Sequence, residues 1–203
     1  SVYDSDFQTL KSSVFLRKLA RQLDMGRFRT IGEYFEYVSA NRSELHKLCL
    51  DLQFGSPAFF QDGALAVLLR DKVMPEILRQ TENEDEIRIW MPGCASGEEA
   101  YSLGMLLLDT MASGKSRKLL KIFATDTNEA RLKTASDGAY TEDQLQALSE
   151  NLRERYFNPL DDGRFKVSSS LRSRVHFSRH NLLTDVPFNG IDFMYCRNLL
   201  AYL

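Results

Sequence analysis

After residue 86 the sequence alternates short apolar runs with amphipathic stretches, and this alternation restricts the fold more than any other feature. Each apolar run has the length and the β-branched or aromatic content of a buried strand. An amphipathic helix is expected after the first run, through Met111, and after the second run, over residues 128–136. Strands that alternate with helices predict an α/β fold with a mostly parallel sheet and helices on both faces. The expected strands comprise residues 87–91, 120–124, 175–177 and 191–195.

The chain before residue 80 has a helical pattern instead, with apolar residues at the spacing of one helix face. A polar, acidic segment over residues 82–86 separates the two patterns, and we place a domain boundary there. The prediction is an all-helical N-terminal domain over residues 1–80 and an α/β domain over residues 81–203, with the helix before the boundary free to pack on either. Helices are expected over residues 13–25, 30–40, 43–53 and 63–79, the last with Leu65, Leu68, Leu69 and Val73 inward.

Composition narrows the class of protein. Apolar residues make up 43% of the chain and charged residues 27%, as in soluble globular proteins, and the net charge is −2. A slightly acidic chain has no broad attraction for nucleic acid, so an enzyme acting on nucleic acid fits poorly. No apolar run approaches the roughly 20 residues that span a bilayer, and the N-terminus lacks a secretory signal. The three cysteines and three histidines show no metal-ligand spacing, so we expect free thiols, a cytoplasmic location and no metal site.

A glycine-containing segment, Pro92–Glu99, follows the first expected strand directly. Glycines in a strand-to-helix turn let the backbone approach a ligand at the carboxyl edge of a sheet. The segment is not a P-loop, because no Lys-Ser or Lys-Thr pair follows Gly97. A second interpretation needs no ligand: Ser96 and Glu99 have the spacing of a capping box at a helix start. Spacing alone leaves both interpretations open.

An acidic residue, Asp126, ends the second expected strand about 30 positions beyond the glycine turn. A carboxylate at this position can accept hydrogen bonds from the two hydroxyls of a ribose. The alternative is that Asp126 caps the helix that starts near Asn128. The glycine turn and Asp126 together favour a cofactor that contains adenosine.

The last expected strand is followed by Cys196-Arg197-Asn198 and, four residues after Asn198, by Tyr202. On a helix Asn198 and Tyr202 face the same way, which places an amide and a phenol over the position predicted for the cofactor. The alternative is that Tyr202 is a buried aromatic anchor.

In this order, the three motifs resemble the signature of the CheR chemotaxis-receptor methyltransferases, and most closely the CheR-like segments of larger hybrid signalling proteins. The resemblance implies a small all-helical N-terminal domain on a class I, Rossmann-like methyltransferase fold. Because the family continues with further strands after the Tyr202 helix, it also implies a fragment that is incomplete at its C-terminus. The segments that carry the resemblance are residues 89–102, 124–126, 137–140, 155–157, 180–183 and 196–198.

The resemblance also implies roles for individual residues. Tyr202 matches a tyrosine near the transferred methyl group. The face formed by Arg17, Lys18 and Arg21 matches a helix that grips receptor helices, although the six basic residues and one acidic residue between Lys11 and Arg29 would otherwise read as a solvated face. The implied cofactor contacts are Gly93, Glu99, Asp126, Asn181, Leu182, Arg197 and Asn198.

The chain departs from the family in its linker motif. Where the family has Thr-x-Phe-Phe-Arg, this chain has Pro57-Ala58-Phe59-Phe60-Gln61. Gln61 lacks the charge with which an arginine holds a carboxylate. Charge-assisted hydrogen bonds contribute about 1.5–3 kcal/mol, so their loss predicts a decrease of roughly one to two decades in rate or affinity. We therefore expect weakened cofactor binding and slow or absent methyl transfer.

The implied reaction is methyl transfer from S-adenosylmethionine to glutamate side chains of chemoreceptor-like proteins, with S-adenosylhomocysteine as the product. The alternative is a catalytically impaired module that binds either compound as a sensor, or that binds signalling partners as a scaffold. A hairpin expected over residues 158–167 matches a small β-subdomain that binds a receptor tail peptide in some family members. Its short form here argues against tail binding.

Overall fold

The structure is a computed structural model that describes residues 28–45, 57–114, 116–197 and 199. The chain divides into two compact units, one formed by Ser1–Ser56 with Asn198–Leu203 and the other by Pro57–Arg197. The predicted helix over residues 13–25 lies outside the described residues, and so do five of the residues with predicted roles. These five are Arg17, Lys18, Arg21, Asn198 and Tyr202.

The described part of the first unit contains helix α2, which spans Ile31–Ala40. Thr30 caps its start, since the Thr30 side chain accepts a hydrogen bond from the Glu33 amide at 3.2 Å. The helix buries Tyr34 and Val38, four residues apart on one face. The helix predicted over residues 30–40 is thus confirmed. Of the helix predicted over residues 43–53, the described residues up to 45 are helical and the rest stays a prediction.

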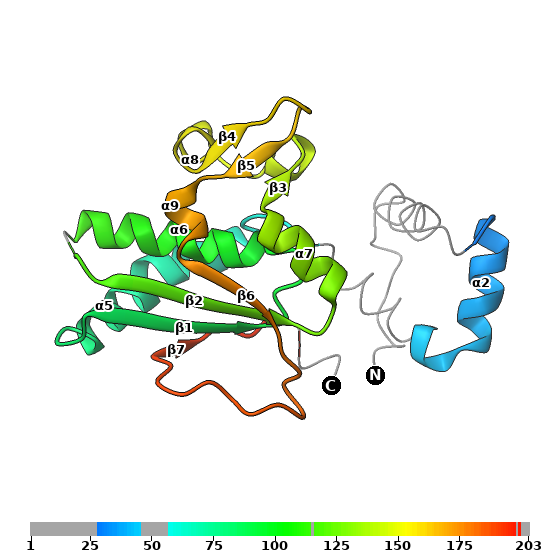
Figure 1. Cartoon of the computed structure of the whole chain (residues 1–203), viewed down its shortest axis with the longest axis horizontal. Helices are drawn as coiled ribbons and strands as arrows, with labels where there is room; N and C mark the ends of the chain where they lie inside the picture. The colour runs from blue at the N-terminus through cyan, green and yellow to red at the C-terminus, as the bar shows by residue number, and fades with distance from the viewer. Residues whose placement is uncertain (1–27, 46–56, 115, 198, 200–203) are drawn as a thin grey trace. The chain divides into compact units, whose positions relative to one another are not determined.

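The second unit is built on a sheet of four parallel strands in the order β6-β2-β1-β7 (Figure 1). In β1 and β2 the paired residues Ile89 and Ile122 are completely buried, as expected for strands covered by other elements. The predicted parallel sheet is therefore confirmed. The strands are β1 (Glu86–Pro92), β2 (Leu119–Asp126), β6 (Val175–Arg179) and β7 (Phe193–Met194).

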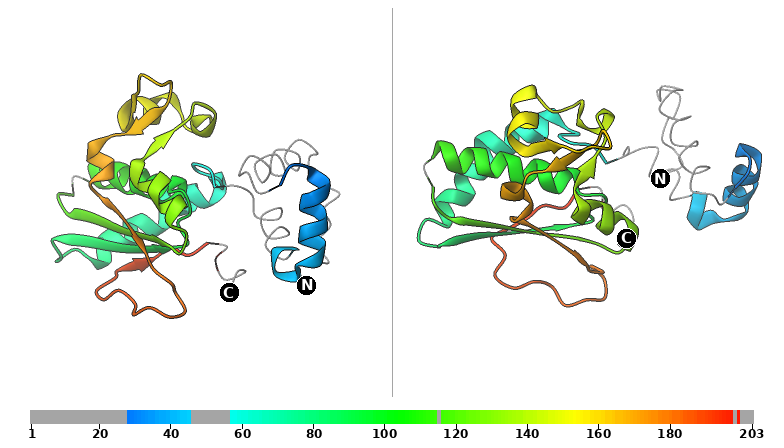
Figure 2. Two further views of the ribbon diagram at one scale, coloured as in Figure 1. Left: turned by 45° about the vertical axis from the view of Figure 1, so that its right-hand side comes forward. Right: turned by 45° about the horizontal axis from the view of Figure 1, so that its top comes forward.

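The helices of this unit lie on one face of the sheet, contrary to the expected helices on both faces (Figures 1 and 2). Among the described residues, the crossover over 180–192 covers the opposite face instead. It contains Pro187 and an Asn-Gly pair and has no helical spacing of apolar residues, so it forms turns and irregular backbone instead of a helix. The ring of Phe188 packs at 5.3 Å from Trp90 and at 5.3 Å from Phe123, which anchors the crossover. The main helices are α6 (Glu98–Ser113) and α7 (Glu129–Asp137).

The helix predicted over residues 63–79 is present, but it contains a π-helical turn. It consists of α4 (Gly63–Leu68), the π-turn η3 (Leu69–Val73) and α5 (Met74–Gln80). Pro75 has no amide to bond four residues back, and the wider turn accommodates this gap. Leu69 is buried and Leu65 and Val73 are half-buried, whereas Leu68 is 50% exposed, so its predicted inward position is wrong. The segment packs on α6. The predicted boundary at residue 80 stays a prediction.

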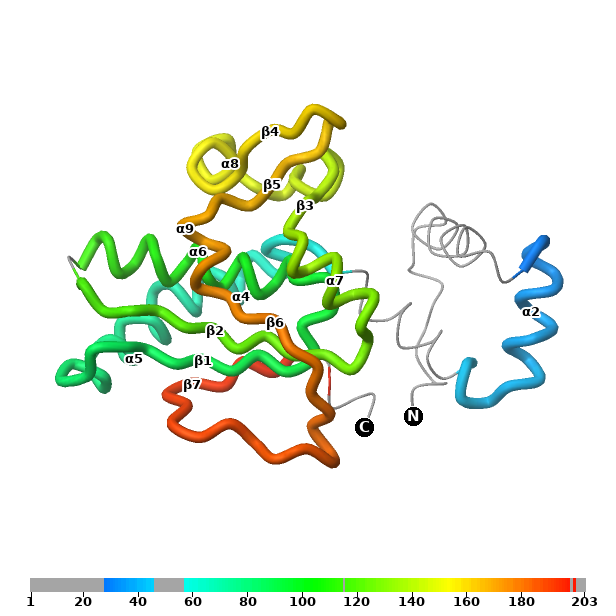
Figure 3. Tube along the Cα trace, in the orientation of Figure 1, coloured from blue at the N-terminus to red at the C-terminus, as the bar shows by residue number. Residues whose placement is uncertain are grey.

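A second, antiparallel sheet in the order β3-β5-β4 stands beside the parallel one, as the chain trace in Figure 3 shows. The hairpin predicted over residues 158–167 is confirmed, with Gly163 in the left-handed conformation at φ 79° in its turn. Phe59 of the linker packs edge-on against Tyr140 at 5.0 Å and Phe157 at 5.5 Å, which fixes the linker to this sheet. The elements are β3 (Ala139–Tyr140), η4 (Asp143–Leu145), α8 (Glu150–Tyr156), β4 (Phe157–Pro159), β5 (Phe165–Val167) and α9 (Ser169–Arg172).

Replacing Phe188 by alanine is expected to lower the free energy of unfolding by about 1–3 kcal/mol, because its ring contacts on the sheet face are lost. The matched control lies in the same crossover: Val186 is 84% exposed, and Val186→Ala should change the value by less than about 0.5 kcal/mol. Urea unfolding of both variants measures the difference. Equal effects would show that the crossover does not cover the sheet.

Candidate functional site

The turn after β1 has a backbone that only a few residue types can adopt. Gly93, Ala95 and Gly97 all have left-handed φ angles, of 74°, 49° and 93°. A Cβ atom on Gly97 would lie 2.8 Å from Ala135 Cβ and 3.0 Å from the Tyr140 hydroxyl, so a side chain does not fit. The left-handed turn folds the chain back from β1 into α6 and leaves Gly93 and Ala95 partly exposed at the carboxyl edge of the sheet.

Asp126, at the end of β2, holds this turn in place. Its Oδ2 accepts a hydrogen bond from the Ala95 amide at 2.9 Å, and its Oδ1 accepts one from the Asn128 amide at 2.9 Å. The cap of α7 is Asn128, whose side chain accepts from the Arg131 amide at 3.1 Å. The alternative that Asp126 caps this helix is therefore wrong. One carboxylate instead connects the loops that follow β1 and β2.

The capping box considered for Ser96 and Glu99 is also absent. Gly97 is the residue at the cap position of α6, and no side chain caps the helix. Ser96 instead donates its hydroxyl to the carboxylate of Glu98, which is 2% exposed and also accepts from Gln144 at 3.3 Å. The carboxylate of Glu99 accepts from Arg197 Nη1 at 2.7 Å. The two adjacent glutamates thus have different environments: Glu98 is buried in the protein, and Glu99 is partly exposed beside Arg197.

Asn181 follows β6 at the same edge of the sheet. The amide of His180 donates to the Asp126 carbonyl at 3.1 Å, which brings the next residue beside the end of β2. The Asn181 side-chain oxygen accepts from the Leu183 amide at 3.0 Å, and its backbone amide donates to Asp185 at 2.8 Å, which lowers the pKa of Asp185. No acceptor in the described part of the chain contacts the side-chain Nδ2 of Asn181. The carboxyl ends of the three strands therefore present three different groups. These are the partly exposed backbone of the turn after β1, the carboxylate at the end of β2 and the amide donor after β6.

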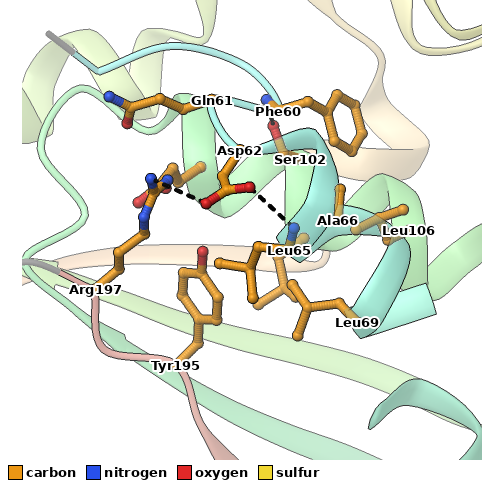
Figure 4. A pocket seen from close by; sticks show the side chains of 12 residues that line it. Phe60, Gln61, Asp62, Leu65, Ala66, Leu69, Ser102, Leu106, Tyr195 and Arg197 are labelled. Carbon is orange, nitrogen blue, oxygen red and sulfur yellow. Dashed lines mark hydrogen bonds and ion pairs between the residues drawn. The ribbon is translucent and has the colours of Figure 1, made fainter. Parts of the chain in front are cut away.

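Arg197 joins the end of the sheet to the linker (Figure 4). Besides Glu99, it approaches Asp62 at 3.7 Å, and Asp62 caps α4 by accepting from the Leu65 amide at 3.0 Å. These residues line a small pocket of about 30 Å³, which has room for roughly one water molecule. Burial, with the charge of Glu99, raises the pKa of Tyr195 in this pocket to about 12. The other lining residues are Phe60, Gln61, Ala66, Leu69, Ser102, Leu103 and Leu106.

The structure brings together most of the described residues with predicted cofactor roles. Gly93 lies in the turn after β1, Glu99 in the first turn of α6 and Asp126 at the end of β2. Asn181 and the half-buried Leu182 follow β6 at the same edge. Gln61 lies at the Arg197 pocket. The sequence interpretation missed Asp62 and Tyr195, although Asp62 immediately before an apolar helical run is a recognisable helix-cap signal. The sequence does not indicate that Asp62 meets Arg197 and Tyr195, because Asp62 lies 135 positions before Arg197 and only folding brings them together.

Over residues 28–45, 57–114, 116–197 and 199, no three His, Cys, Asp or Glu side chains stand close enough together to hold a metal ion. Within the same part of the chain, no helix has the length and apolar character needed to cross a membrane.

The strand order, the glycine turn after β1 and the acidic residue at the end of β2 define an α/β protein of the class that binds nucleoside cofactors. Residues 56–203 match the family described as CheR methyltransferase, SAM binding domain. This match covers more than half of the chain, and the chain belongs to the CheR methyltransferase family. Its cofactor is S-adenosylmethionine.

Individual relatives agree with this family. The chain is 31% identical over 191 residues to the chemotaxis protein methyltransferase of Borreliella burgdorferi, covering 91% of this chain and 68% of that protein. It is 30% identical over 206 residues to chemotaxis protein methyltransferase 1 of Pseudomonas aeruginosa, covering 99% and 73%. It is also 32% identical over 197 residues to an uncharacterised 104.1 kDa protein of Rhodobacter capsulatus, covering 97% of this chain but only 21% of that protein.

The residues at the carboxyl edge fit S-adenosylmethionine. A carboxylate has about four lone-pair positions, and the two amides use two of those of Asp126, so its oxygens can still accept hydrogen bonds from a ribose. Gly93 has no side chain and is only half-buried, and the Asn181 side-chain amide offers a donor to a purine edge.

Replacing Gly97 by alanine is expected to lower the free energy of unfolding by about 2–4 kcal/mol, since the change adds left-handed strain and a clash with α7. Gly163 provides the control, because it has a similar φ of 79° with nothing within 4 Å of an added Cβ. Gly163→Ala should therefore report the strain alone, about 1–2 kcal/mol. Chemical unfolding of both variants measures the packing contribution as the difference, and equal losses would contradict the close approach at Gly97.

Proposed function

We propose that this chain transfers a methyl group from S-adenosylmethionine to glutamate side chains of chemoreceptor-like proteins. The observation that carries the proposal is the hydrogen bond from the Ala95 amide to the Asp126 carboxylate. It holds an acceptor for a ribose against the glycine turn, within the residues that match the SAM binding domain. Relatives named chemotaxis protein methyltransferase support the same activity and favour it over a sensor or scaffold without catalysis.

The bound cofactor supplies a methyl group that is already activated on a sulfonium sulfur. The protein has to orient the donor and the acceptor carboxylate in line and exclude water. Asp126 and Asn181 are suited to hold the ribose and the purine, while the glycine turn lets the nucleoside approach the backbone. Orientation, and not acid or base chemistry, is therefore the main contribution of these residues.

Glu99 and Arg197 are suited to fix the remaining part of the cofactor. Their charge-assisted hydrogen bond at 2.7 Å orients both groups, and the two side chains are only 24% and 22% exposed. The pKa of Arg197 is raised by its hydrogen bond and charge interaction with Glu99, against an opposing effect of burial, so the guanidinium stays charged. A fixed cation beside a fixed carboxylate can bind the amino and carboxylate ends of an amino acid.

The acceptor glutamate would enter on the side of the linker. Gln61 stands where the family has an arginine, and Pro57 stands where it has a threonine. Arg197 is the cation that lines the same pocket as Gln61 in the described residues, but Glu99 and Asp62 already hold it. The acceptor carboxylate therefore lacks a dedicated cation, and we propose a slow transfer reaction with cofactor binding retained.

The partner proteins and cellular location are part of the same proposal. The chain spans 21% of the R. capsulatus relative, so it is suited to act as one domain of a longer signalling protein. We propose that it acts in the cytoplasm on receptor helices, with Arg17, Lys18 and Arg21 as the docking face and Tyr202 and Asn198 over the cofactor.

Replacing Asp126 by asparagine should weaken S-adenosylmethionine binding about ten- to hundredfold, because the amide replaces a charged acceptor with a donor facing a backbone N–H. Asp162 is the matched control: its Oδ1 also accepts from the amide two residues on, at 3.1 Å, but in the hairpin turn. Titration calorimetry with Asp162→Asn should show unchanged affinity. Equal binding by both variants would remove Asp126 from the cofactor site.

Replacing Gln61 by arginine should raise methyl transfer by roughly one to two decades, since it restores a charged ligand for the acceptor carboxylate. Transfer of labelled methyl groups to a chemoreceptor fragment measures the rate. Gln80→Arg adds the same charge at the end of α5 and should leave the rate unchanged. Binding of the cofactor without transfer by either the parent chain or Gln61→Arg would support the sensor instead, and absence of cofactor binding would contradict both.

A further inference from the structure

Strand β6 leaves one side of its backbone unpaired. The Arg174 carbonyl accepts from the Ile122 amide at 2.8 Å and the His180 amide donates to the Asp126 carbonyl at 3.1 Å. The even-numbered residues from 174 to 180 therefore bond toward β2. The alternate residues Val175, Phe177 and Arg179 therefore direct their amides and carbonyls away from the sheet. Among the described residues no strand lies on that side, and β6 forms an edge of the sheet (Figures 1 and 2).

An open depression of about 490 Å³ lies beside this edge. Val175 and Phe177 contribute its apolar part, and Ser136, Ser169, Arg172 and Ser173 contribute hydroxyl groups and a guanidinium from α7, α9 and the residue after it. It belongs entirely to the Pro57–Arg197 unit and is separate from the cofactor loops. We call the outward edge of β6 together with this depression the β6 groove.

The charge around the β6 groove is strongly one-sided. Residues 169–179, which form α9 and β6 and connect them, contain Arg172, Arg174 and Arg179 and no Asp or Glu. Within the described ranges no carboxylate pairs with Arg172, and the Nε of Arg174 is buried without a hydrogen-bond partner. Arg179 has a long, 3.8 Å contact with Glu129, whose side chain is 81% exposed, and a charge interaction with Asp185. The groove thus offers guanidinium groups that nearby carboxylates leave largely unneutralised.

We propose that the β6 groove binds an extended, acidic segment of a partner protein. The segment adds a strand to β6 through the outward backbone groups of Val175, Phe177 and Arg179, as in β-augmentation. An acidic side chain of the segment enters the depression, where Arg172 and the serine hydroxyls bind it. Pairing with a second copy of this chain is disfavoured, because it would oppose the same basic residues to one another.

The probe is a fluorescent peptide of about eight residues, the length of a typical strand, that alternates glutamate and valine. Fluorescence anisotropy with the full chain should show saturable binding. Hydrogen–deuterium exchange should slow at the amides of Val175, Phe177 and Arg179 and at no other strand. The same peptide with lysine for glutamate should bind at least about tenfold more weakly, since its charge opposes the groove.

Variants separate backbone pairing from charge. Arg179→Pro removes an outward amide that bonds to nothing in the sheet, whereas Arg179→Ala removes the same charge and keeps the amide. The proline variant should bind the peptide at least about tenfold more weakly than the alanine variant, and Arg172→Glu should weaken binding as much. Unchanged S-adenosylmethionine affinity shows that each variant is folded.

Three outcomes would overturn the proposal: no saturable binding of the acidic peptide, equal binding of the lysine peptide, or equal binding by Arg179→Pro and Arg179→Ala. A concentration-dependent dimer in sedimentation that Arg179→Pro abolishes would assign the edge to a second copy and would also overturn it.

Discussion

The hydrogen bonds of the Asp126 carboxylate are the constraint on which the rest of the site depends. One oxygen accepts a hydrogen bond from the turn after β1 and the other accepts one from the residue before α7. A single, half-buried carboxylate therefore sets the spacing of the two loops. Charge-assisted bonds of this kind are the stronger hydrogen bonds in proteins, and they hold an otherwise strained backbone with a left-handed Ala95. The same carboxylate retains acceptor capacity toward a ligand, which connects the fold of this edge with its chemistry.

The two adjacent glutamates at the start of α6 show how the fold divides chemically identical groups. Glu98 turns into the protein, where Ser96 and Gln144 donate to it. Glu99 turns to Arg197, which also approaches Asp62 at the cap of α4. Because Asp62 directly follows Gln61, this chain of charges couples the linker to the end of the sheet. The linker, in which the chain departs from the family pattern, is therefore connected through Asp62 to Arg197, which matches that pattern.

The two faces and two edges of the sheet have different physical roles. Helices cover one face, and aromatic rings of the crossover cover part of the other, with Phe188 between Trp90 and Phe123. The cofactor loops gather at the carboxyl ends of the strands, where parallel strands place them together. The free edge of β6 ends at these loops, since Arg179 pairs with Asp126. It carries basic residues, a common means of preventing unwanted strand pairing that also selects for an acidic partner.

The sequence by itself determined the four strands of the parallel sheet, the helices that follow the first two of them, the hairpin, the glycine turn and the family, because periodicity and turn residues act over short distances. It did not indicate the short elements β3, η4, α8 and α9. It did not determine the single helical face, the π-turn before Pro75 or the exposure of Leu68, which depend on what packs against each segment. Tertiary structure alone decided the capping alternatives. Ser96 binds Glu98 and Asn128 caps α7, so Glu99 and Asp126 instead accept hydrogen bonds from Arg197 and Ala95, which are 98 and 31 positions away. Hydrogen bonds over such separations form only when folding brings the partners together, and no local pattern encodes them.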